Sequence, residues 1–473
     1  MPVAPRYACL FQDRKHLYQF LFECQQRSLE KQHPQIASIS VEIDPVDPLA
    51  VLHEVVQPNQ FHFYFEQSLS GEKVAAIGNA LSLEVDGSRR FEKTRQFIQS
   101  HLDHFISTAA HDLPVVPPRF FCGFTFFDQV SASQSLFPAT TVFLPQWQIL
   151  RRRDECQVTT NWVIHPRLNL EHLTETIWEQ FQAIRLARYG VFHLPDEMRH
   201  RLNQWDITDT DRFMATVIAA LKPIHTHRIN KIVLAHAIDV TARFPFQWAR
   251  SLYNLRQLHP DCYVFSISNG KGQSFIGASP ERLISIRDRT LITDALAGSA
   301  PRGKTTHEDG ELAEGLINSK KERHEHHVVV EFLTQTLRQL GIQPQFASAP
   351  RLLQLSNIQH LHTPIRADLP NHLHPLDILA ELHPTPAVAG MPRDMACHLI
   401  RRLEPFERSL YAGPLGWVDA QGNAEFIVGI RSAFMDGHHA RLYAGAGIVA
   451  GSEPEREMAE VRLKLQALLQ ALV

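Results

Sequence analysis

Two glutamates close to the C-terminus have the type and spacing of metal ligands or acid–base groups. Glu457 and Glu460 lie in SEPEREMAE, after the strand-like run RLYAGAGIVAG, which we expect to break at its glycines. Ser452 and Glu455 have the spacing of a capping box, and Pro454 suits a first helical turn, so a helix begins here. Its expected buried stripe is Met458, Val461, Leu465, Leu468 and Leu472. The helix presents two carboxylates beside its apolar face, a pattern that ordinary amphipathic helices also show.

A second helix places carboxylates on its own core-facing side. The segment SKKERHEHHVVVEFLTQTLRQLG ends at Gly341, and its stripe is Glu322, Glu325, Val329, Leu333, Thr336 and Leu340. A buried carboxylate is costly unless it is paired, hydrogen-bonded or bound to a cation. A capping box with Ser319 would account for Glu322, whereas Glu325 has no such explanation.

Together the two helices indicate a site for a hard cation. Each offers carboxylates near its first turns, without imidazoles or thiolates at matching spacing. Such a donor set favours Mg²⁺, which binds one or two protein carboxylates together with waters and an anionic substrate group. The sequence therefore predicts an anionic substrate.

Lys231 and Glu281 are candidate acid–base groups. Lys231 opens the apolar strand KIVLAHAIDV, and burial on both faces would lower the pKa of its ammonium and make it a base. Glu281 lies in the turn GASPERL, where a raised pKa would make it a general acid. The alternatives are a strand-end lysine in solvent and a polar hairpin residue.

Arg431 and two glycine-containing bends are candidate anion-binding groups. Arg431 lies in FIVGIRSA, a nearly alternating apolar run, so its guanidinium is expected in a partly buried site that suits a carboxylate. Gly445-Ala446-Gly447 and Gly298-Ser299 offer backbone N–H groups for another anion. Glycines within strands also mark simple bulges.

Composition describes a globular chain without a basic footprint. Its 473 residues allow two to four domains or one large one, with 44% hydrophobic and 21% charged residues. The net charge of −3 argues against nucleic acid as the main partner. Six scattered cysteines suit a reduced compartment, and neither a signal peptide nor an apolar run of membrane-spanning length is evident. We therefore expect a cytoplasmic protein.

The chain alternates strand-like and helical patterns. The first half contains a helical pattern at Ser88–Ile106 and strand-like runs at Phe61–Gln67, Ser70–Gly78, Phe120–Phe127 and Ala139–Arg152. A polar stretch, Pro195–Asp211, is the expected boundary or connection. The second half has strands at Lys231–Val240, Cys262–Asn269, Gln273–Ser299, Asn423–Gly437 and Ala440–Ile448. Hairpin-length turns between them predict antiparallel sheet with helices packed outside.

These motifs resemble those of the chorismate-utilising enzymes. GASPERL, ALAGSAPRG, SKKERHEH, HPTPAVAG, RSLYAGPLGW, FIVGIRSA and AGAGIVAGSEPEREMAE occur in the order seen in isochorismate synthases, salicylate synthases and the large subunits of anthranilate and aminodeoxychorismate synthases. The resemblance implies an α+β fold of two large stacked antiparallel sheets with outer helices. Residues 205–473 would form the chorismate-binding region, and residues 1–204 a sheet and helix layer of the same fold.

The resemblance also implies roles for individual residues. It makes Glu325 and Glu460 the Mg²⁺ ligands, with Glu322 and Glu457 in or near the layer of residues that surrounds those ligands. It assigns substrate binding to Arg431, Tyr411, His360 and the segment around Gly298, Ser299, Gly445 and Gly447.

Within the family, the resemblance favours an isochorismate synthase. Lys231 matches the base that activates water, and Ala387 with Val388 matches the alanine and aliphatic residue of isochorismate synthases. Water would attack C2 of chorismate while Glu281 protonates the departing C4 hydroxyl. LPQWQILR resembles the menaquinone or phylloquinone branch, and we expect a monomer without a glutaminase subunit.

Two departures and two alternatives accompany this interpretation. His236 stands where the family usually has arginine, and Asp294 where glutamate is common; both bear on substrate positioning. Salicylate synthase, or an amination component with a glutaminase, is the alternative within the enzyme class. A catalytically silent chorismate-binding regulator is the alternative of another class.

Overall fold

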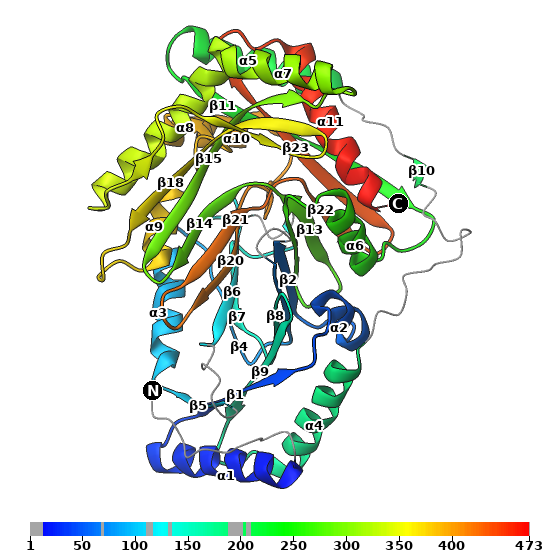
Figure 1. Cartoon of the computed structure of the whole chain (residues 1–473), viewed down its shortest axis with the longest axis vertical. Coiled ribbons are helices and arrows are strands. Elements are labelled where there is room, and N and C mark those ends of the chain that lie inside the picture. Colours follow the sequence, from blue (N-terminus) through cyan, green and yellow to red (C-terminus); the bar gives the residue numbers. More distant parts are fainter. Residues whose placement is uncertain are drawn as a thin grey trace.

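The computed structural model describes residues 13–67, 71–109, 117–130, 135–187, 202–204 and 210–472. Two large β-sheets organise these residues, and helices lie around them (Figure 1). The helices are α1 (Arg14–Lys31), α2 (Pro48–Val55), α3 (Arg90–Leu102), α4 (Leu170–Leu186), α5 (Thr210–His225), α6 (Trp248–Leu258), α7 (Thr306–Asn318), α8 (Lys320–Gln339), α9 (Pro375–Leu382), α10 (Arg393–Leu403) and α11 (Pro454–Leu472). Most of the expected boundary Pro195–Asp211 lies outside the described residues.

The first sheet has 13 strands, drawn from both halves of the chain. In spatial order they are β10 (Leu202–Gln204), β11 (Lys231–Ala242), β23 (His439–Val449), β22 (Ser432–Asp436), β13 (Ser274–Ser279), β12 (Tyr263–Ser268), β2 (His62–Gln67), β3 (Glu72–Ile77), β8 (Trp147–Arg152), β9 (Glu155–Ile164), β1 (Gln35–Ile43) and β5 (Phe105–Ala109). A short strand, β19 (Gly390–Met391), also pairs with β11.

The second sheet has 10 strands and is likewise built from both halves. Its order is β16 (Gln345–Phe346), β18 (Ile358–Asp368), β15 (Thr290–Pro301), β14 (Arg282–Arg287), β21 (Ala424–Val428), β20 (Pro414–Asp419), β6 (Arg119–Phe124), β7 (Thr140–Leu144) and β4 (Leu81–Glu84), with β17 (Arg351–Gln354) also on β18. The strand pairs of the described residues are antiparallel apart from β1 with β5. The predicted α+β fold with two antiparallel sheets is confirmed, and that parallel edge pair is an addition to it.

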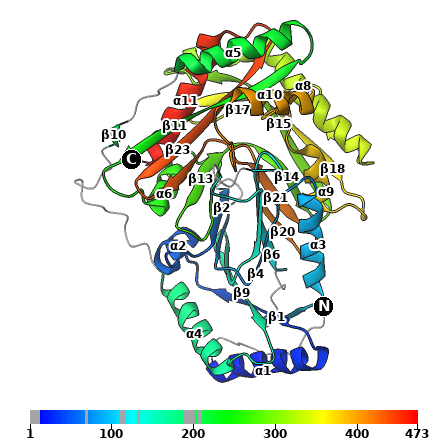
Figure 2. The same ribbon diagram turned by 180° about the vertical axis from the view of Figure 1, so that it is seen from behind.

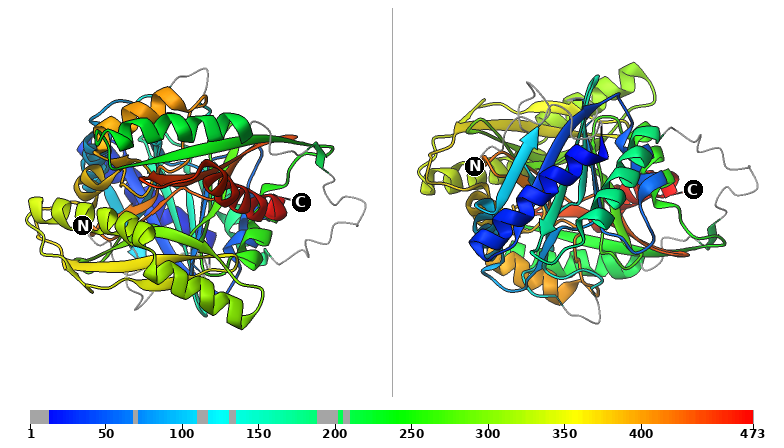
Figure 3. Two further views of the ribbon diagram at one scale, coloured as in Figure 1. Left: turned by 90° about the horizontal axis from the view of Figure 1, so that it is seen from above. Right: turned by 90° about the horizontal axis from the view of Figure 1, so that it is seen from below.

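Aromatic side chains join the two sheets in one core. Phe63 of β2 packs on Phe121 of β6 with ring centroids 5.0 Å apart, and both side chains are fully buried. The opposite view shows α1 and α4 at one end of the molecule and α5, α10 and α11 at the other (Figure 2). Seen from above, α11 lies between α5 and α8 (Figure 3). The last helix is thus placed where elements of both sheets come together.

The two predicted carboxylate helices form with the expected buried faces. In α8, Glu325, Val329, Leu333 and Thr336 are buried, and Gly341 takes a left-handed φ of 76° just after the helix. In α11, Met458, Val461, Leu465, Leu468 and Leu472 are all buried. Both helices pack on strands, α8 on β15 and α11 on β23.

Two local expectations are wrong. The helical pattern of Ser88–Ile106 ends at Leu102, because Phe105 and Ile106 pair with Ile36 and Ala37 of β1. The predicted kink at Gly445 to Gly447 does not form: β23 continues through these glycines and pairs with β11, with Gly447 opposite Val233, and the strand ends only at Val449, in the turn that contains Gly451. The glycines there meet a different requirement, close approach of neighbouring side chains.

Among the described residues, every helix is too short or too polar to cross a membrane.

Candidate active site

A cleft at the α8 and α11 end of the sheets brings together most of the side chains predicted from the motifs. Its lining comes from β11 and β23 of one sheet, β15 and β18 of the other, and both carboxylate helices. The predicted residues that line it are Glu281, Gly298, Ser299, Glu325, His360, Ala387, Val388, Tyr411, Arg431, Gly445, Gly447 and Glu460. Lys231, Glu322 and Glu457 lie just behind this lining.

Arg431 enters the cleft from a bend between β21 and β22, not from within a strand as predicted. Its φ of 50° is left-handed, and its side chain is buried. Nη2 donates a hydrogen bond of 2.9 Å to Nε2 of His360, and Nη1 lies 3.9 Å from the sulfur of Cys262. Burial lowers the pKa of Arg431, yet a guanidinium keeps its charge in proteins. A fixed, buried cation therefore faces the cleft.

His360 links Arg431 to Ser299, and its tautomer follows from its partners. Because a guanidinium can only donate, Nε2 of His360 is the acceptor and Nδ1 carries the hydrogen. Nδ1 then donates to Oγ of Ser299 at 3.0 Å. Burial, reinforced by Arg431, holds the pKa of His360 well below its usual range. The imidazole is neutral and acts as a spacer between cation and hydroxyl.

Glu281 has the environment of a general acid. It is buried at the turn before β14, and its amide N–H donates to Oγ of Ser279 at 3.2 Å. Burial raises the pKa of this carboxyl to about 8, with Asp294 adding to the rise and Lys231 opposing it. A carboxyl group in this setting keeps its proton at neutral pH.

Lys231, at the start of β11, is completely buried behind the lining of the cleft. Its Nζ lies 2.9 Å from Oε1 of Glu325, an ion pair without hydrogen-bond geometry, and Nζ finds no hydrogen-bond acceptor among the described residues. Gly447 makes this arrangement possible, because a Cβ there would lie 2.4 Å from that carboxylate oxygen and 3.2 Å from Cε of Lys231. The strand-end lysine reaching solvent, considered above, is excluded.

Lys464 is a cleft residue that the motifs did not reveal. Its Nζ lies 2.7 Å from Oε1 of Glu460 and donates to the carbonyl of Gly445 at 2.8 Å. Burial raises the pKa of Glu460, but the Lys464 ammonium outweighs it and the net pKa is below the usual range. The signal that could have found Lys464 is its position one helical turn after Glu460.

Tyr411 lies next to Gly445 of β23. It is buried, its ring stacks on Tyr443 at 5.1 Å, and its hydroxyl oxygen lies 2.9 Å from the position that a Cβ at Gly445 would take. Burial raises the pKa of Tyr411, so the hydroxyl stays protonated and can donate into the cleft.

The outer carboxylates have protein partners of their own. Lys321 lies 2.9 Å from Oε1 of Glu457 and 3.5 Å from Oε1 of Glu322. Glu322 also accepts the amide N–H of Ser299 at 3.1 Å. Burial raises the pKa of Glu457 and, with Glu325 nearby, that of Glu322.

Neither predicted capping box forms completely. Ser319 does cap α8, since its side chain accepts the N–H of Glu322. The carboxylate of Glu322 turns instead to Ser299, which completes a contact between α8 and β15. Ser452 accepts the N–H of Val449 and so closes the turn before α11.

The carboxylates of the cleft suit Mg²⁺. No three His, Cys, Asp or Glu side chains of the described ranges converge as a complete metal cage. Mg²⁺ does not require one, because it is commonly held by one or two carboxylates, waters and substrate oxygens. Glu325 and Glu460 line the cleft from two different helices, which matches that donor set.

The two departures from the family pattern lie in different places. His236 lines a small separate cavity and contacts the ring of Phe213 on α5, so it is not part of the cleft lining. Asp294 is half-buried between Arg282 and His362, which lie 2.9 Å from its carboxylate oxygens. Asp294 therefore acts on the cleft only through its charge, at Glu281.

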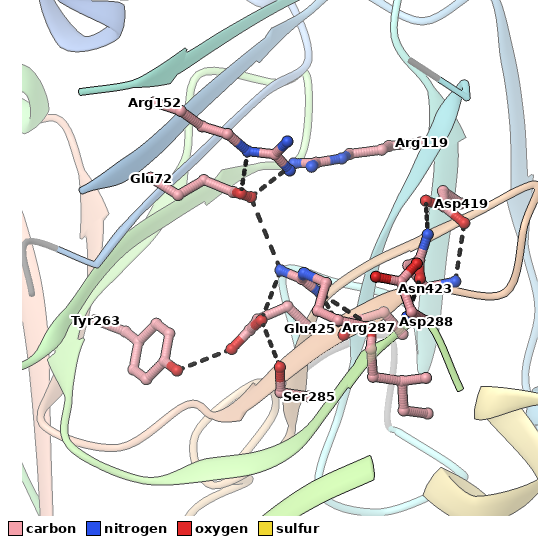
Figure 4. A network of polar contacts seen from close by, with 12 residues as sticks. Glu72, Arg119, Arg152, Tyr263, Ser285, Arg287, Asp288, Asp419, Asn423 and Glu425 are labelled. Carbon is pink, nitrogen blue, oxygen red and sulfur yellow. Dashed lines mark hydrogen bonds and ion pairs between the residues drawn. The ribbon is translucent and has the colours of Figure 1, made fainter. Parts of the chain in front are cut away.

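A larger cavity, of about 670 Å³, lies apart from the cleft and spans the two sheets in a similar way. Its polar network is drawn in Figure 4: Glu72 of β3 faces Arg119, Arg152 and Arg287, and Arg287 also binds Glu425. Nothing in the motifs had pointed to this region.

Comparisons with known proteins agree with the family resemblance of the motifs. The family model described as chorismate binding enzyme matches residues 19–473. The salicylate biosynthesis isochorismate synthase of Pseudomonas aeruginosa is 33% identical over 453 residues, covering 93% of this chain and 90% of that protein. The chain belongs to the chorismate-binding enzymes.

Two further relatives match over almost their full length. The isochorismate synthase MenF of Bacillus subtilis is 29% identical, covering 94% of this chain and 95% of that protein. The solved structure of the menaquinone-specific isochorismate synthase of Escherichia coli superposes with a TM-score of 0.76 at 28% identity, covering 96% of this chain and 100% of that one.

Proposed function

We propose that the protein converts chorismate to isochorismate by adding water at C2 and expelling the C4 hydroxyl. The observation that carries this proposal is the pair Lys231 and Glu281. One cleft is bordered by a buried lysine without a hydrogen-bond acceptor and by a buried carboxyl group that holds its proton to about pH 8. A hydroxyl transposition needs a base for the water and an acid for the leaving group.

Lys231 serves as the base. Its Nζ takes one proton from the attacking water, whose oxygen forms the new bond to C2 while the ring double bonds shift. Lys231 is on β11, and the antiparallel pairing with β23 over this stretch holds its backbone rigidly. The glycine at position 447 leaves room for the lysine stem and the Glu325 carboxylate side by side.

Glu281 serves as the acid. Its proton passes to the C4 hydroxyl oxygen, the C4–O bond breaks, and water leaves. Asp294 favours the protonated form of Glu281 because two neighbouring carboxylates avoid carrying charge together. The proton donor and the proton acceptor thus differ in type and in position, since Glu281 lies in the turn before β14 and Lys231 lies on β11.

Arg431 and Tyr411 hold the carboxylates of the substrate. Arg431 offers a buried guanidinium whose orientation is fixed by His360, and Tyr411 offers a protonated hydroxyl. Mg²⁺, when bound, would neutralise the ring carboxylate. Glu325 and Glu460 are the residues that would hold the metal.

The test is a product assay with purified protein. Incubation with chorismate and Mg²⁺, followed by chromatography, is expected to yield isochorismate without added ammonia. Salicylate with pyruvate would contradict the proposal and favour the lyase alternative. A requirement for ammonia would favour amination, and absence of turnover would favour a silent binding protein.

We further propose that the isochorismate feeds menaquinone or phylloquinone synthesis. Support comes from full-length similarity to two MenF proteins. The Pseudomonas relative, named for salicylate biosynthesis, favours salicylate as a second destination. Complementation of bacteria that lack menaquinone-specific isochorismate synthase, scored by quinone content, separates the two.

A further inference from the structure

A fully buried arginine, Arg408, lies directly behind the lining of the cleft. Its residue is only 1% exposed, and its counterion is the buried carboxylate of Glu404, whose Oε2 accepts the Nε–H of Arg408 at 2.8 Å. A guanidinium has five N–H donors and keeps its charge in proteins. Because buried polar groups are costly without hydrogen bonds, the remaining donors of Arg408 need acceptors inside the protein.

Those acceptors are the backbone carbonyls of two residues that line the cleft. Nη1 of Arg408 donates to the carbonyl of Val388 at 2.8 Å, and Nη2 donates to the carbonyl of Val233 at 2.8 Å. Both valines line the cleft, although Val233 is on β11 and Val388 lies between α9 and β19. One rigid, planar group therefore fixes the spacing between two distant parts of the lining.

Tyr411, a third residue of the lining, is also next to this guanidinium. Cζ of Arg408 lies 5.8 Å from the centroid of the Tyr411 ring, and 4.4 Å from that of Phe126. The backbone N–H of Tyr411 donates to the carbonyl of Arg408 at 2.9 Å. The position of the Tyr411 ring thus depends on Arg408 through the backbone and through a cation over the ring.

The ion pair of Glu404 and Arg408 also completes one edge of β11. Among the described residues, β19 pairs only with the first two residues of this strand, and β10 only with the last two. Between them, the N–H of Ala235 donates to Oε1 of Glu404 at 2.8 Å, and the carbonyl of Val233 accepts from Arg408. The two side chains satisfy backbone groups that a neighbouring strand would otherwise satisfy.

We propose that Arg408 is a positioning residue for the substrate, which holds Val388 and Tyr411 against β11 and so sets the shape of the cleft. The inference rests on the proposed function, because it takes chorismate as the molecule in the cleft. Lys231 should stay in place without Arg408, since β23 pairs with the other edge of β11. Loss of the guanidinium should therefore weaken ground-state and transition-state binding alike, which raises KM and leaves kcat unchanged.

Arg408→Lys tests the inference, because lysine keeps the charge beside Glu404 but lacks the planar fork that reaches both carbonyls. KM for chorismate, measured from initial rates with Mg²⁺, is expected to rise about tenfold, with kcat within about twofold of wild type. A merely structural role would act differently, since unfolded molecules lower the apparent kcat and leave KM unchanged. An unchanged KM in Arg408→Lys overturns the inference.

Arg256→Lys is the matched control. Arg256 is also buried, at 8% exposed, and its nitrogens lie 2.8 Å and 2.6 Å from carboxylate oxygens of Asp47 and Glu66. It does not line the cleft. The control should unfold at a lower urea concentration than wild type, with KM unchanged. An equal rise of KM in both variants would trace the effect to a general loosening of the fold and overturn the inference.

Glu404→Gln decides the question if Arg408→Lys does not fold. The amide oxygen of the variant can still accept the N–H of Ala235, whereas the charge that anchors Arg408 is lost. We expect KM to rise about threefold, because a neutral acceptor holds a guanidinium more weakly than a carboxylate does. A KM equal to that of wild type rejects the positioning role.

A binding measurement separates this inference from the proposed function. Chorismate affinity is measured by calorimetry in Glu281→Ala, with and without Arg408→Lys. An affinity about tenfold weaker with Arg408→Lys supports the positioning role even if wild-type protein forms no isochorismate, a result that overturns the proposed function alone. Equal affinities overturn the positioning role alone, and the absence of chorismate binding in both proteins overturns both proposals.

Discussion

Two polar regions connect the same two sheets, yet they use different cations. In the network of Figure 4, carboxylates are held by arginines: Glu72 by Arg119, Arg152 and Arg287. In the cleft, Glu325 and Glu460 are each held by one lysine. Guanidinium groups form planar forks that fix a carboxylate, whereas an ammonium is a point charge on a flexible stem. The carboxylates of the network are therefore fixed in place, whereas those of the cleft can accept another cation.

Aromatic stacking reinforces that difference. Arg119 and Arg287 lie over the ring of Trp417 at 3.7 Å and 4.6 Å, so both arginines are held by more than their charge. The cleft is lined instead by glycines 298, 445 and 447, which leave space around its charged groups. Similar charges are therefore held firmly in one region and have open space beside them in the other.

The comparison between the cleft and the network is tested most strongly by substituting the proposed proton donor and acceptor of the cleft. Lys231→Ala and Glu281→Ala are each expected to lower kcat by about a thousandfold or more, the range of acid–base catalysis. Mg²⁺-dependent chorismate binding should persist, as measured by calorimetry. Retained turnover in either variant would remove that residue from its role.

A substitution in the network of Figure 4 should lower the stability of the protein and leave its catalytic rate unchanged. Glu72→Ala leaves three arginines without their shared carboxylate, and because Arg119 alone is buried, the loss of its acceptor is expected to cost about 1–3 kcal/mol. Urea unfolding measures the loss, with kcat per folded molecule unchanged. Glu84→Ala, an exposed glutamate on β4, is the control and should cost less than about 0.5 kcal/mol. A large fall in kcat for Glu72→Ala would erase the distinction between the regions.

Gly447→Ala tests whether space in the cleft is needed. The added methyl group would collide with the Glu325 carboxylate, and a misplacement of about 1 Å can cost roughly a hundredfold in rate. Steady-state kinetics with circular dichroism as a folding check measures the effect. Gly437→Ala tests a glycine with open space around it, although its left-handed φ of 56° adds backbone strain.

The pH dependence gives the smallest expected effect. Because the role proposed for Glu281 requires its protonated form, kcat/KM should fall tenfold per pH unit above about 8. Glu281→Asp, with a shorter side chain, should move that limb if the assignment holds. A limb that does not change in Glu281→Asp would assign it to another group.

The same carboxyl links pH to stability. Its folded pKa of about 8 exceeds the unfolded value, so its contribution is complete below the unfolded pKa and is lost as pH rises through about 8. Glu281→Gln should therefore unfold with a weaker pH dependence between pH 5 and 9, measured by urea titration at each pH. Parallel curves for variant and wild type would contradict the shift.

The sequence carried the local elements of the site well. Helical periodicity predicted α8 and α11 and the carboxylates on their faces, because a buried stripe repeats every three to four residues in the sequence itself. The family resemblance and the two-sheet fold were confirmed. The roles assigned to individual cleft residues, and the Mg²⁺ itself, stay predictions.

The features that the sequence did not predict depend on contacts between distant parts of the chain. Glu72 meets Arg119 and Arg287 only after strands from separate segments join two sheets, so no local pattern indicates the network. The bend at Arg431 and the unbroken glycine strand depend on close neighbours in space, here His360 and Glu325. Residue spacing predicts a single helix or strand, whereas these features depend on how helices and strands pack against one another.

The pairing of β11 with β23 has a consequence for how the enzyme is made. The strand carrying Lys231 completes its sheet only by pairing with residues 439–449, some two hundred positions later. Glu460 follows still later, in α11. During synthesis the nascent chain therefore cannot assemble its cleft until residues as far as Glu460 have left the ribosome. A nascent chain that ends before α11 would carry Lys231 without Glu460, so the two residues meet in the cleft only after residue 460 has been made.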